Sequence, residues 1–217
     1  MNDSLLILGV DATSEFGSVA VRRGGQTLAE LQIRNPDGLG PVIIQAIQEV
    51  LEKAEVRLEE IDCFASANGP GSFTGVRVGV AVVKGLAEAL NKRVAGVSNL
   101  LALSSFGHAL LRAVVLDARR EQVFGAVYDA NGKAVVEEEV STFRELQLKV
   151  PFDAEWVGWE NGPCEKAGVR FTAAPRWLAV AVAECAWRRG PSGWSDPVAL
   201  DANYVRRSDA EMFWKDS

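Results

Sequence analysis

Val10-Asp11-Ala12-Thr13-Ser14-Glu15 is matched 106 positions later by Leu116-Asp117-Ala118-Arg119-Arg120-Glu121. The correspondence continues without a gap, because Ala20-Val21 aligns with Ala126-Val127. Both copies follow one order: an apolar run, an Asp-Ala turn, a second strand, a tight turn and a third strand. Two β-hairpins can share a few identities by chance, but matching order and spacing over about 25 residues favour a duplicated supersecondary unit.

The rest of the chain alternates between strand and helix patterns. After the first hairpin, around Gly24-Gly25, apolar residues recur at helical spacing from Leu39 to Ala54. The segments that follow predict strands at 61–67, 94–97 and near 156–157, and helices at 74–90, 100–106, after 141 and at 175–189. No low-complexity linker divides the chain. We therefore expect an α/β fold of two joined lobes, residues 1–108 and a smaller lobe of residues 109–217, each built from a βββαβα unit.

Composition narrows the class of function. The 217 residues carry 23 Lys and Arg against 29 Asp and Glu. Up to His108 there are 9 basic and 12 acidic residues, and after it 14 and 17, so each half has a net charge of −3. This distribution disfavours direct binding to a nucleic-acid backbone, which needs clustered Lys and Arg. A single histidine excludes a zinc site of the two-histidine helical type.

The three cysteines, Cys63, Cys164 and Cys185, are odd in number, far apart and form no CxxC pair. This pattern indicates neither a disulfide framework nor a metal knuckle, and it is typical of a reducing compartment. The N-terminus has no basic region, and the apolar segment from Trp177 to Trp187 is shorter than the roughly 20 residues a membrane helix needs. We expect a cytoplasmic protein that does not span a membrane.

Gly69-Pro70-Gly71-Ser72-Phe73-Thr74-Gly75 follows a predicted strand and opens a predicted helix. Glycines allow close backbone approach, and the free N–H groups of a helix N-terminus attract anions, so a phosphate-binding loop is one interpretation. The other is a tight strand-to-helix turn in which Ser72 or Thr74 caps the helix. The loop is not a Walker A motif, because no Lys-Ser/Thr pair follows at the required spacing.

The helix predicted at 74–90 is apolar on nearly all sides. Only Arg77, Lys84 and Glu88 interrupt it, and Gly79, Ala81, Gly85 and Ala89 would let a partner helix approach closely. A helix of this kind must be covered on both sides, either by its own chain or by another subunit.

Two turns hold further candidates. Asp11, Thr13 and Ser14 could orient phosphate oxygens or metal-bound water, or could close an Asx-type turn. Asp117 and Arg119 occupy the equivalent turn of the second copy, where a guanidinium could bind a phosphate or pair with a neighbouring acid.

Four segments together resemble the bacterial TsaB (YeaZ) family: Val10 to Ser14, Gly69 to Gly79, Leu116 to Arg119, and Tyr204-Val205-Arg206-Arg207. The resemblance spans nearly the whole chain, and the GPGSFTG-x-R-x-G stretch is its most specific part. It implies an actin/Hsp70/sugar-kinase-like (ASKHA) fold. It also implies a role in forming N6-threonylcarbamoyladenosine beside the anticodon of tRNAs that read codons beginning with A.

The resemblance further implies a non-catalytic partner of the transferase TsaD, working with the ATPase TsaE, and a homodimer when alone. It implies that tRNA is bound only through the complex, that no catalytic residue or metal ligand is present, and that ATP or ADP enters mainly within the complex. The interface residues it suggests are Phe73, Thr74, Arg77, Val78, Val80, Ala81 and Lys84; the nucleotide or phosphate candidates are Asp11, Thr13, Ser14, Gly69, Gly71 and Ser72.

Two departures and two alternatives accompany the resemblance. TsaD-like transferases hold a metal through paired histidines, which this chain lacks, and Asn35-Pro36-Asp37-Gly38 stands where family members often have His-Ser-Glu. The alternative function is an autonomous ASKHA-type ATPase or phosphotransferase that uses Asp11, Thr13 and the glycine loop. A peptidase, which an older label of related proteins suggests, finds no evident triad around His108.

Overall fold

The structure, a computed structural model, describes residues 3–205 and consists of two compact units. The first contains the described chain up to Ala102 together with Pro175–Ala202, and the second contains Leu103–Ala174 and the described residues from Asn203. This division differs from the expected one after His108, because the segment after residue 174 returns to the first unit. Arg206 and Arg207 lie outside the described residues.

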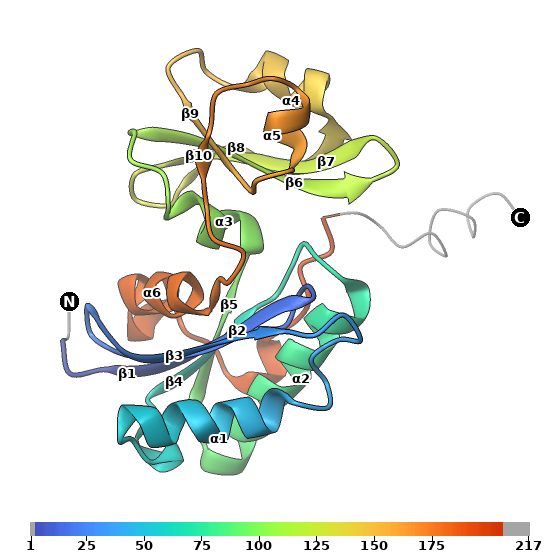
Figure 1. Cartoon of the computed structure of the whole chain (residues 1–217). Coiled ribbons are helices and arrows are strands. Elements are labelled where there is room, and N and C mark those ends of the chain that lie inside the picture. Colours follow the sequence, from blue (N-terminus) through green and yellow to red (C-terminus); the bar gives the residue numbers. More distant parts are fainter. Residues whose placement is uncertain (1–2, 206–217) are drawn as a thin grey trace, which may run out of the picture. The chain divides into compact units, whose positions relative to one another are not determined.

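The first unit contains a five-stranded sheet of order β3-β2-β1-β4-β5. The strands β1 (Leu6–Asp11), β2 (Phe16–Arg23) and β3 (Gln26–Arg34) are antiparallel, and β4 (Cys63–Ala67) and β5 (Arg93–Val97) add in parallel to β1. Helices α1 (Ile43–Ala54) and α2 (Phe73–Leu90) cover one face of this sheet, and α6 (Ala179–Arg189) covers the other (Figure 1). β1 is buried along its full length, as a strand covered on both faces must be.

Two helices begin later than the sequence pattern predicts. The helix expected from Leu39 begins at Ile43, but Leu39 is still buried, because its side chain fills the space that the missing Cβ of Gly17 leaves. The helix expected from Pro175 begins at Ala179. The N–H of its first residue, Ala179, donates a hydrogen bond to Ser18 Oγ on β2 over 3.0 Å, which satisfies a donor that has no partner within the helix. This contact is part of the reason that α6 packs on β1 and β2.

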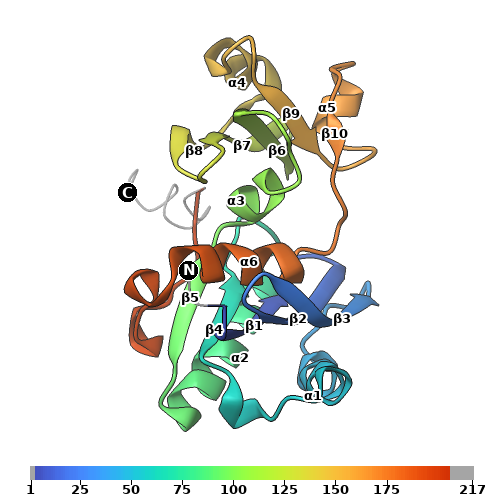
Figure 2. The same cartoon turned by 90° about the vertical axis from the view of Figure 1, so that its left-hand side faces the viewer.

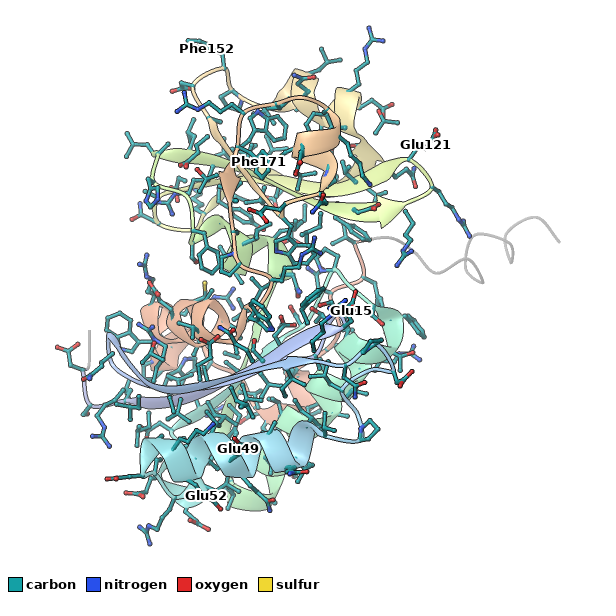
Figure 3. The ribbon with its side chains drawn as sticks, in the orientation of Figure 1. Glu15, Glu49, Glu52, Glu121, Phe152 and Phe171 are labelled. Carbon is teal, nitrogen blue, oxygen red and sulfur yellow. The ribbon has the colours of Figure 1, made fainter. Side chains whose placement is uncertain are left out.

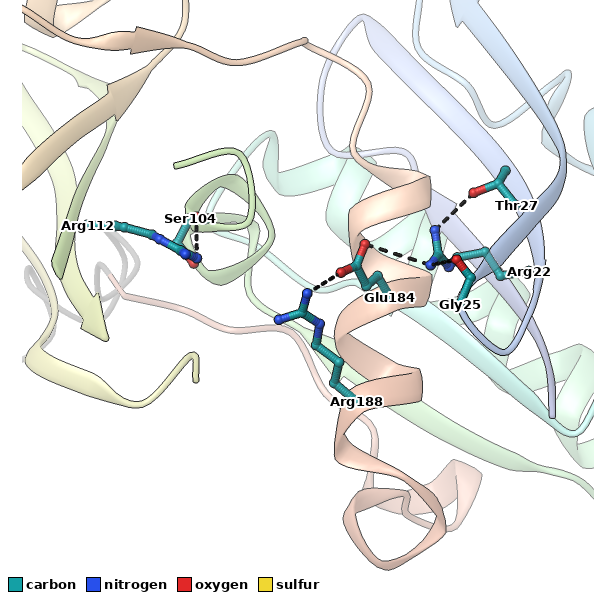
Figure 4. Close-up of polar contacts among 7 residues, drawn as sticks. All are labelled: Arg22, Gly25, Thr27, Ser104, Arg112, Glu184 and Arg188. Atoms are coloured by element: carbon teal, nitrogen blue, oxygen red, sulfur yellow. Dashed lines mark hydrogen bonds and ion pairs between the residues drawn. The ribbon is translucent and has the colours of Figure 1, made fainter. Parts of the chain in front are cut away.

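A buried arginine joins the β2–β3 hairpin to α6 (Figure 4). Arg22 is 6% exposed; it donates to Thr27 Oγ1 over 2.9 Å and to the Gly25 carbonyl over 2.8 Å. Glu184 on α6 lies 3.8 Å from the Arg22 guanidinium and also pairs with Arg188 over 2.5 Å. A guanidinium at this depth needs such partners, because an unpaired buried charge is costly.

The second unit repeats this topology in a shorter form (Figure 2). Its sheet has the order β10-β9-β6-β7-β8, with β6 (Leu111–Arg119), β7 (Gln122–Asp129) and β8 (Ala134–Thr142) antiparallel and β9 (Glu155–Gly158) and β10 (Thr172–Ala173) parallel. β7 begins and ends 106 positions after β2, which confirms the predicted duplication. Helices α4 (Phe143–Lys149) and α5 (Pro163–Lys166) contribute Leu146 and Cys164 to one core cluster.

The two units differ most in the helix between their fourth and fifth strands. It has 18 residues in the first unit and 4 in the second, where α5 takes the place of α2. A short α3 (Asn99–Ser104) leads out of the first unit, and the described part of the chain also contains 3-10 turns at Leu58–Glu60, Pro191–Gly193 and Pro197–Ala199. No helix in residues 3–205 has the length and apolar character to cross a membrane.

Candidate functional site

The glycine loop and the β1–β2 turn form one hydrogen-bonded assembly, which we call the loop–turn cluster: Asp11, Thr13, Gly69, Ser72 and Asn99. The Thr13 hydroxyl donates to Asp11 Oδ1 over 2.6 Å and accepts from the Asn99 amide over 2.5 Å. The Gly69 N–H donates to Asn99 Oδ1 over 3.0 Å, and the Ser72 N–H donates to the Thr13 carbonyl over 2.7 Å. Ser72 also caps α2 by accepting from the Gly75 N–H over 3.3 Å.

The glycines of this loop are explained by packing against the turn. A Cβ on Gly71 would lie 2.8 Å from both Cβ and the carbonyl oxygen of Thr13, and a Cβ on Gly75 would lie 2.2 Å from the Ala12 carbonyl oxygen. Gly69 has a φ of +109°, a conformation that favours glycine. The tight strand-to-helix turn with Ser72 as N-cap, one of the two interpretations of the sequence, therefore describes this loop.

Asp11 is a buried carboxylate that accepts a hydrogen bond from the N–H group at the start of α6. It is 1% exposed. Burial raises the pKa of Asp11 above its ordinary value, and hydrogen bonds from the Thr13 hydroxyl and from the N–H groups of Thr13 and Leu178 oppose that rise. Leu178 directly precedes α6, so Asp11 and Ser18 together satisfy the first N–H groups of that helix.

The residues predicted to bind a nucleotide or phosphate make hydrogen bonds within the protein, and these bonds show which of their groups could also bind a phosphate. The Asp11 carboxylate, the Thr13 hydroxyl and the Ser72 N–H already bond to protein groups. Ser14 bonds locally, since its hydroxyl donates to the Phe16 carbonyl and accepts from the Phe16 N–H. The Asp11 carboxylate, the Thr13 hydroxyl and the Ser72 N–H thus fasten the loop, the turn and α6 together, and in this conformation these three groups do not fit a phosphate.

The equivalent turn of the second unit is exposed rather than buried. Asp117 accepts from the Arg119 N–H over 2.7 Å in an Asx-type turn, and Lys166 lies 3.9 Å from its other oxygen. Arg119, Arg120 and Glu121 all have positive φ, and Glu121 lies at the tip of the β6–β7 hairpin (Figure 3). Asp117 and Asp11 occupy equivalent positions, but only Asp11 is placed to cap a helix.

α2 has one face in the core and one open face. The open face, which we call the α2 strip, consists of exposed residues at helical spacing: Thr74, Arg77, Ala81, Gly85 and Glu88. A Cβ on Gly85 would meet nothing within 4 Å. Phe73, which is 52% exposed, extends the strip at its N-terminal end, and the Arg77 guanidinium carbon lies 3.8 Å from the centroid of its ring. Within the described chain, this side of the helix is thus left uncovered.

Three of the residues predicted for the interface lie outside the α2 strip. Val80 is 8% exposed and packs in the core cluster, so it does not belong to the open face. Val78 is half-buried against the same cluster. Lys84 turns to its own chain, where Nζ donates to the carbonyls of Val198 and Leu200 over 3.3 and 3.0 Å. Phe73, Thr74, Arg77 and Ala81 are exposed as expected.

Sequence reasoning missed Asn99, which joins the glycine loop to the β1–β2 turn. It is 1% exposed, and its own N–H also donates to the Gly69 carbonyl over 2.8 Å. A polar residue just after the predicted strand 94–97 was the available signal, because the carboxyl ends of parallel strands meet at one edge of a sheet. Within residues 3–205, no three His, Cys, Asp or Glu side chains gather where they could hold a metal ion.

Comparison with known proteins places this geometry in a family. The family model "TsaD: tRNA N6-adenosine threonylcarbamoyltransferase" matches residues 41–163. The chain is 32% identical over 174 residues to the tRNA threonylcarbamoyladenosine biosynthesis protein TsaB of Escherichia coli K12, covering 72% of this chain and 73% of that protein. It is 35% identical over 127 residues to TsaB of Haemophilus influenzae, covering 56% and 52%. It is also 32% identical over 112 residues to the tRNA N6-adenosine threonylcarbamoyltransferase of Protochlamydia amoebophila, covering 44% and 33%.

Solved structures agree with these relatives. A Pseudomonas aeruginosa protein described as uncharacterized and similar to peptidase YEAZ has a TM-score of 0.76 at 26% identity, covering 93% of this chain and 100% of that one. YeaZ from Pseudomonas aeruginosa has a TM-score of 0.73 at 27% identity, covering 92% and 99%. The resemblance inferred from the sequence motifs is confirmed: the chain belongs to the TsaB (YeaZ) family of tRNA threonylcarbamoyladenosine biosynthesis proteins and has an α/β fold of the ASKHA type.

Proposed function

We propose that this protein is a non-catalytic subunit that activates a TsaD-type transferase in the synthesis of N6-threonylcarbamoyladenosine on tRNA, and that α2 is its docking helix. The observation that carries the proposal is the α2 strip, where Ala81 and Gly85 face outward from an otherwise apolar helix. Small residues let a second helix approach closely, and the exposed Arg77 and Glu88 can pair with charges at the rim.

The occupant we propose for the strip is the corresponding helix of TsaD. The match of this chain to the TsaD family model supports a partner of related fold, and residues 41–163 of that match include α1 and α2. Ile44, which is 49% exposed, lies on α1, the other helix that covers this face of the sheet (Figure 1). A second copy of this chain offers the same helix, so we propose a homodimer when TsaD is absent.

TsaE and tRNA enter this proposal through the complex. The net charge of −6 disfavours direct binding to a tRNA backbone, so we assign tRNA binding to TsaD. ATP or ADP is handled within the complex with TsaE. For the alternative, an autonomous ATPase, Asp11, Thr13 and Ser72 would first have to leave their present partners.

Reconstitution tests this function. Purified protein and TsaD from the same organism are mixed and resolved by size-exclusion chromatography, and tRNA modification is then measured with TsaE and the threonylcarbamoyl-adenylate synthase present. We expect a stable complex and modification that depends on this chain. Failure to associate, together with full modification by TsaD unaided, would overturn the proposal. Isothermal titration of the isolated chain with ATP and magnesium tests the alternative, which requires heat of binding and turnover.

A further inference from the structure

A cross-strand pair of charged residues in the second unit forms hydrogen bonds with the backbone segment that connects this unit to the first. Arg112 on β6 and Glu155 on β9 are direct partners in the parallel register of these strands. Each directs polar atoms to the backbone of residues 104–109, the segment that follows the passage between the units at Ala102–Leu103.

The positive side chain of Arg112 binds backbone carbonyl groups, and the negative side chain of Glu155 binds backbone N–H groups. Arg112 donates from Nε to the Ala109 carbonyl over 2.9 Å and from Nη1 to the Ser104 carbonyl over 3.3 Å (Figure 4). Glu155 Oε2 accepts from the N–H groups of His108 and Ala109 over 2.5 and 2.7 Å. Hydrogen bonds to charged groups are roughly twice as strong as neutral ones. The connecting segment is thus held by four charge-assisted bonds.

The second oxygen of Glu155 reaches the next passage between the units. Oε1 accepts from the Thr172 hydroxyl over 2.5 Å, and Thr172 lies in β10, three residues before the chain returns to the first unit at Pro175. Ala174 is fixed as well, since its N–H donates to the Gly158 carbonyl over 2.9 Å. One carboxylate therefore joins two connections that are more than 60 residues apart in sequence.

Packing closes the remaining space around this segment. A Cβ on Gly107 would lie 2.9 Å from Val157 Cγ2 and 3.0 Å from Cγ and Cδ of Arg112. The third passage, at Ala202–Asn203, has a separate carboxylate, because Asn203 donates to Glu138 Oε2 over 2.7 Å. The Arg112–Glu155 pair thus serves the first two passages only.

We propose that Arg112 and Glu155 form a clamp that makes the ends of two connections rigid parts of the second unit. At the first two passages, bending of the chain is then confined to the junctions Ala102–Leu103 and Ala174–Pro175. This is a conformational device built into the fold, in which a few residues at element ends absorb the backbone change. It is independent of the proposed partner.

Distance measurements between spin labels test the clamp. Cysteines introduced at Glu52 on α1 and at Phe152, both exposed and one in each unit (Figure 3), accept the labels, while the native cysteines are buried. The Glu155→Gln variant keeps the size of the side chain but removes its charge. We expect a broader distance distribution than in the parent protein, and no broadening with Glu137→Gln, an exposed control on β8. Equal widths for Glu155→Gln and its parent would overturn the proposal.

Hydrogen exchange distinguishes a carboxylate that holds both connections from one that only binds the N–H groups of residues 108 and 109. In Glu155→Gln we expect amides in both 104–110 and 171–174 to exchange roughly tenfold faster, with the centre of β6 unchanged. Faster exchange at 108–109 alone would contradict the coupling. If Glu155→Gln does not fold, Thr172→Val removes only the β10 arm; faster exchange then appears in 171–174, and its absence contradicts the clamp.

Discussion

The Thr13 hydroxyl donates a hydrogen bond to the Asp11 carboxylate over 2.6 Å, and both side chains are buried. This pair sits where the sequence suggested a phosphate or metal-water ligand. Its partners, Asn99 and the N–H of Leu178, belong to other elements of the first unit. The Asp-x-Thr turn thus fastens the glycine loop and α6 to β1.

Replacing Asp11 by asparagine should change how stability depends on pH. The folded-state pKa of Asp11 is raised by burial, so its contribution to stability is fully present below its ordinary value of 3.8 and is lost as pH rises through the raised pKa. Asp11→Asn has no such dependence. Urea unfolding at several pH values should show the parent protein losing stability relative to Asp11→Asn as the pH rises above 3.8. If the stabilities of the two proteins changed with pH in parallel, the raised pKa of Asp11 would be contradicted.

Removing the acceptor altogether should be costly. Asp11→Ala leaves the Thr13 hydroxyl and the Leu178 N–H without their partner inside the protein. An unsatisfied buried donor costs about 1–3 kcal/mol. The free energy of unfolding should therefore fall by about that amount, as denaturant titration at neutral pH measures. A loss no larger than that of Asp11→Asn would mean that water replaces the carboxylate.

Two glycines of α2 should respond in opposite directions to alanine. Gly75→Ala places a Cβ against the Ala12 carbonyl and should cost about 1–3 kcal/mol by overpacking. Gly85→Ala meets open space and should gain about 0.5–1 kcal/mol from helix propensity. Thermal unfolding measures both. If Gly85 lies under a partner helix, the more stable Gly85→Ala variant should also bind TsaD less tightly, which separates docking from folding.

The ion pair between Arg22 and Glu184 should stabilise α6 on the hairpin. Glu184→Gln leaves the guanidinium, with a side chain 7% exposed, without its acid partner and should lower the free energy of unfolding by about 1–3 kcal/mol. Glu49→Gln on α1 is the matched control, because its ion pair with Lys53 is exposed and should contribute less than about 1 kcal/mol. Equal losses in the two variants would show that Arg22 is solvated.

Much of the fold follows from local pattern. Most strands and the duplication were predictable, because alternation, turn residues and a constant offset are local properties of the chain, whereas β10 (Thr172–Ala173) was not predicted. The return of residues 175–202 to the first unit was not, because it depends on Ser18 capping Ala179, 161 positions away. The start of α1 was missed for a similar reason: Leu39 is buried like a helix residue, but it fills the space beside Gly17.

The site was predicted only in part. The sequence predicts that α2 is apolar on nearly all sides, and helical spacing places Val80 and Ala81 on opposite faces, but that pattern does not decide which face enters the core. Tertiary packing decides: Gly79 lies against Ser66, with 3.2 Å between its added Cβ and Ser66 Oγ, and this orients Val80 into the core and Ala81 outward. The two interpretations of the glycine loop likewise depend on contacts with Thr13 that only the folded chain reveals.

Binding of Ala81→Glu to TsaD tests the central proposal most directly. A carboxylate in the middle of the α2 strip should leave the melting temperature unchanged, because Ala81 is exposed, and should weaken association at least tenfold, because an unpaired charge buried at an interface costs several kcal/mol. Gln147→Glu on α4 adds the same charge to an exposed helix position of the second unit and should bind normally. Unchanged affinity of folded Ala81→Glu, measured by isothermal titration with TsaD, would contradict docking through α2.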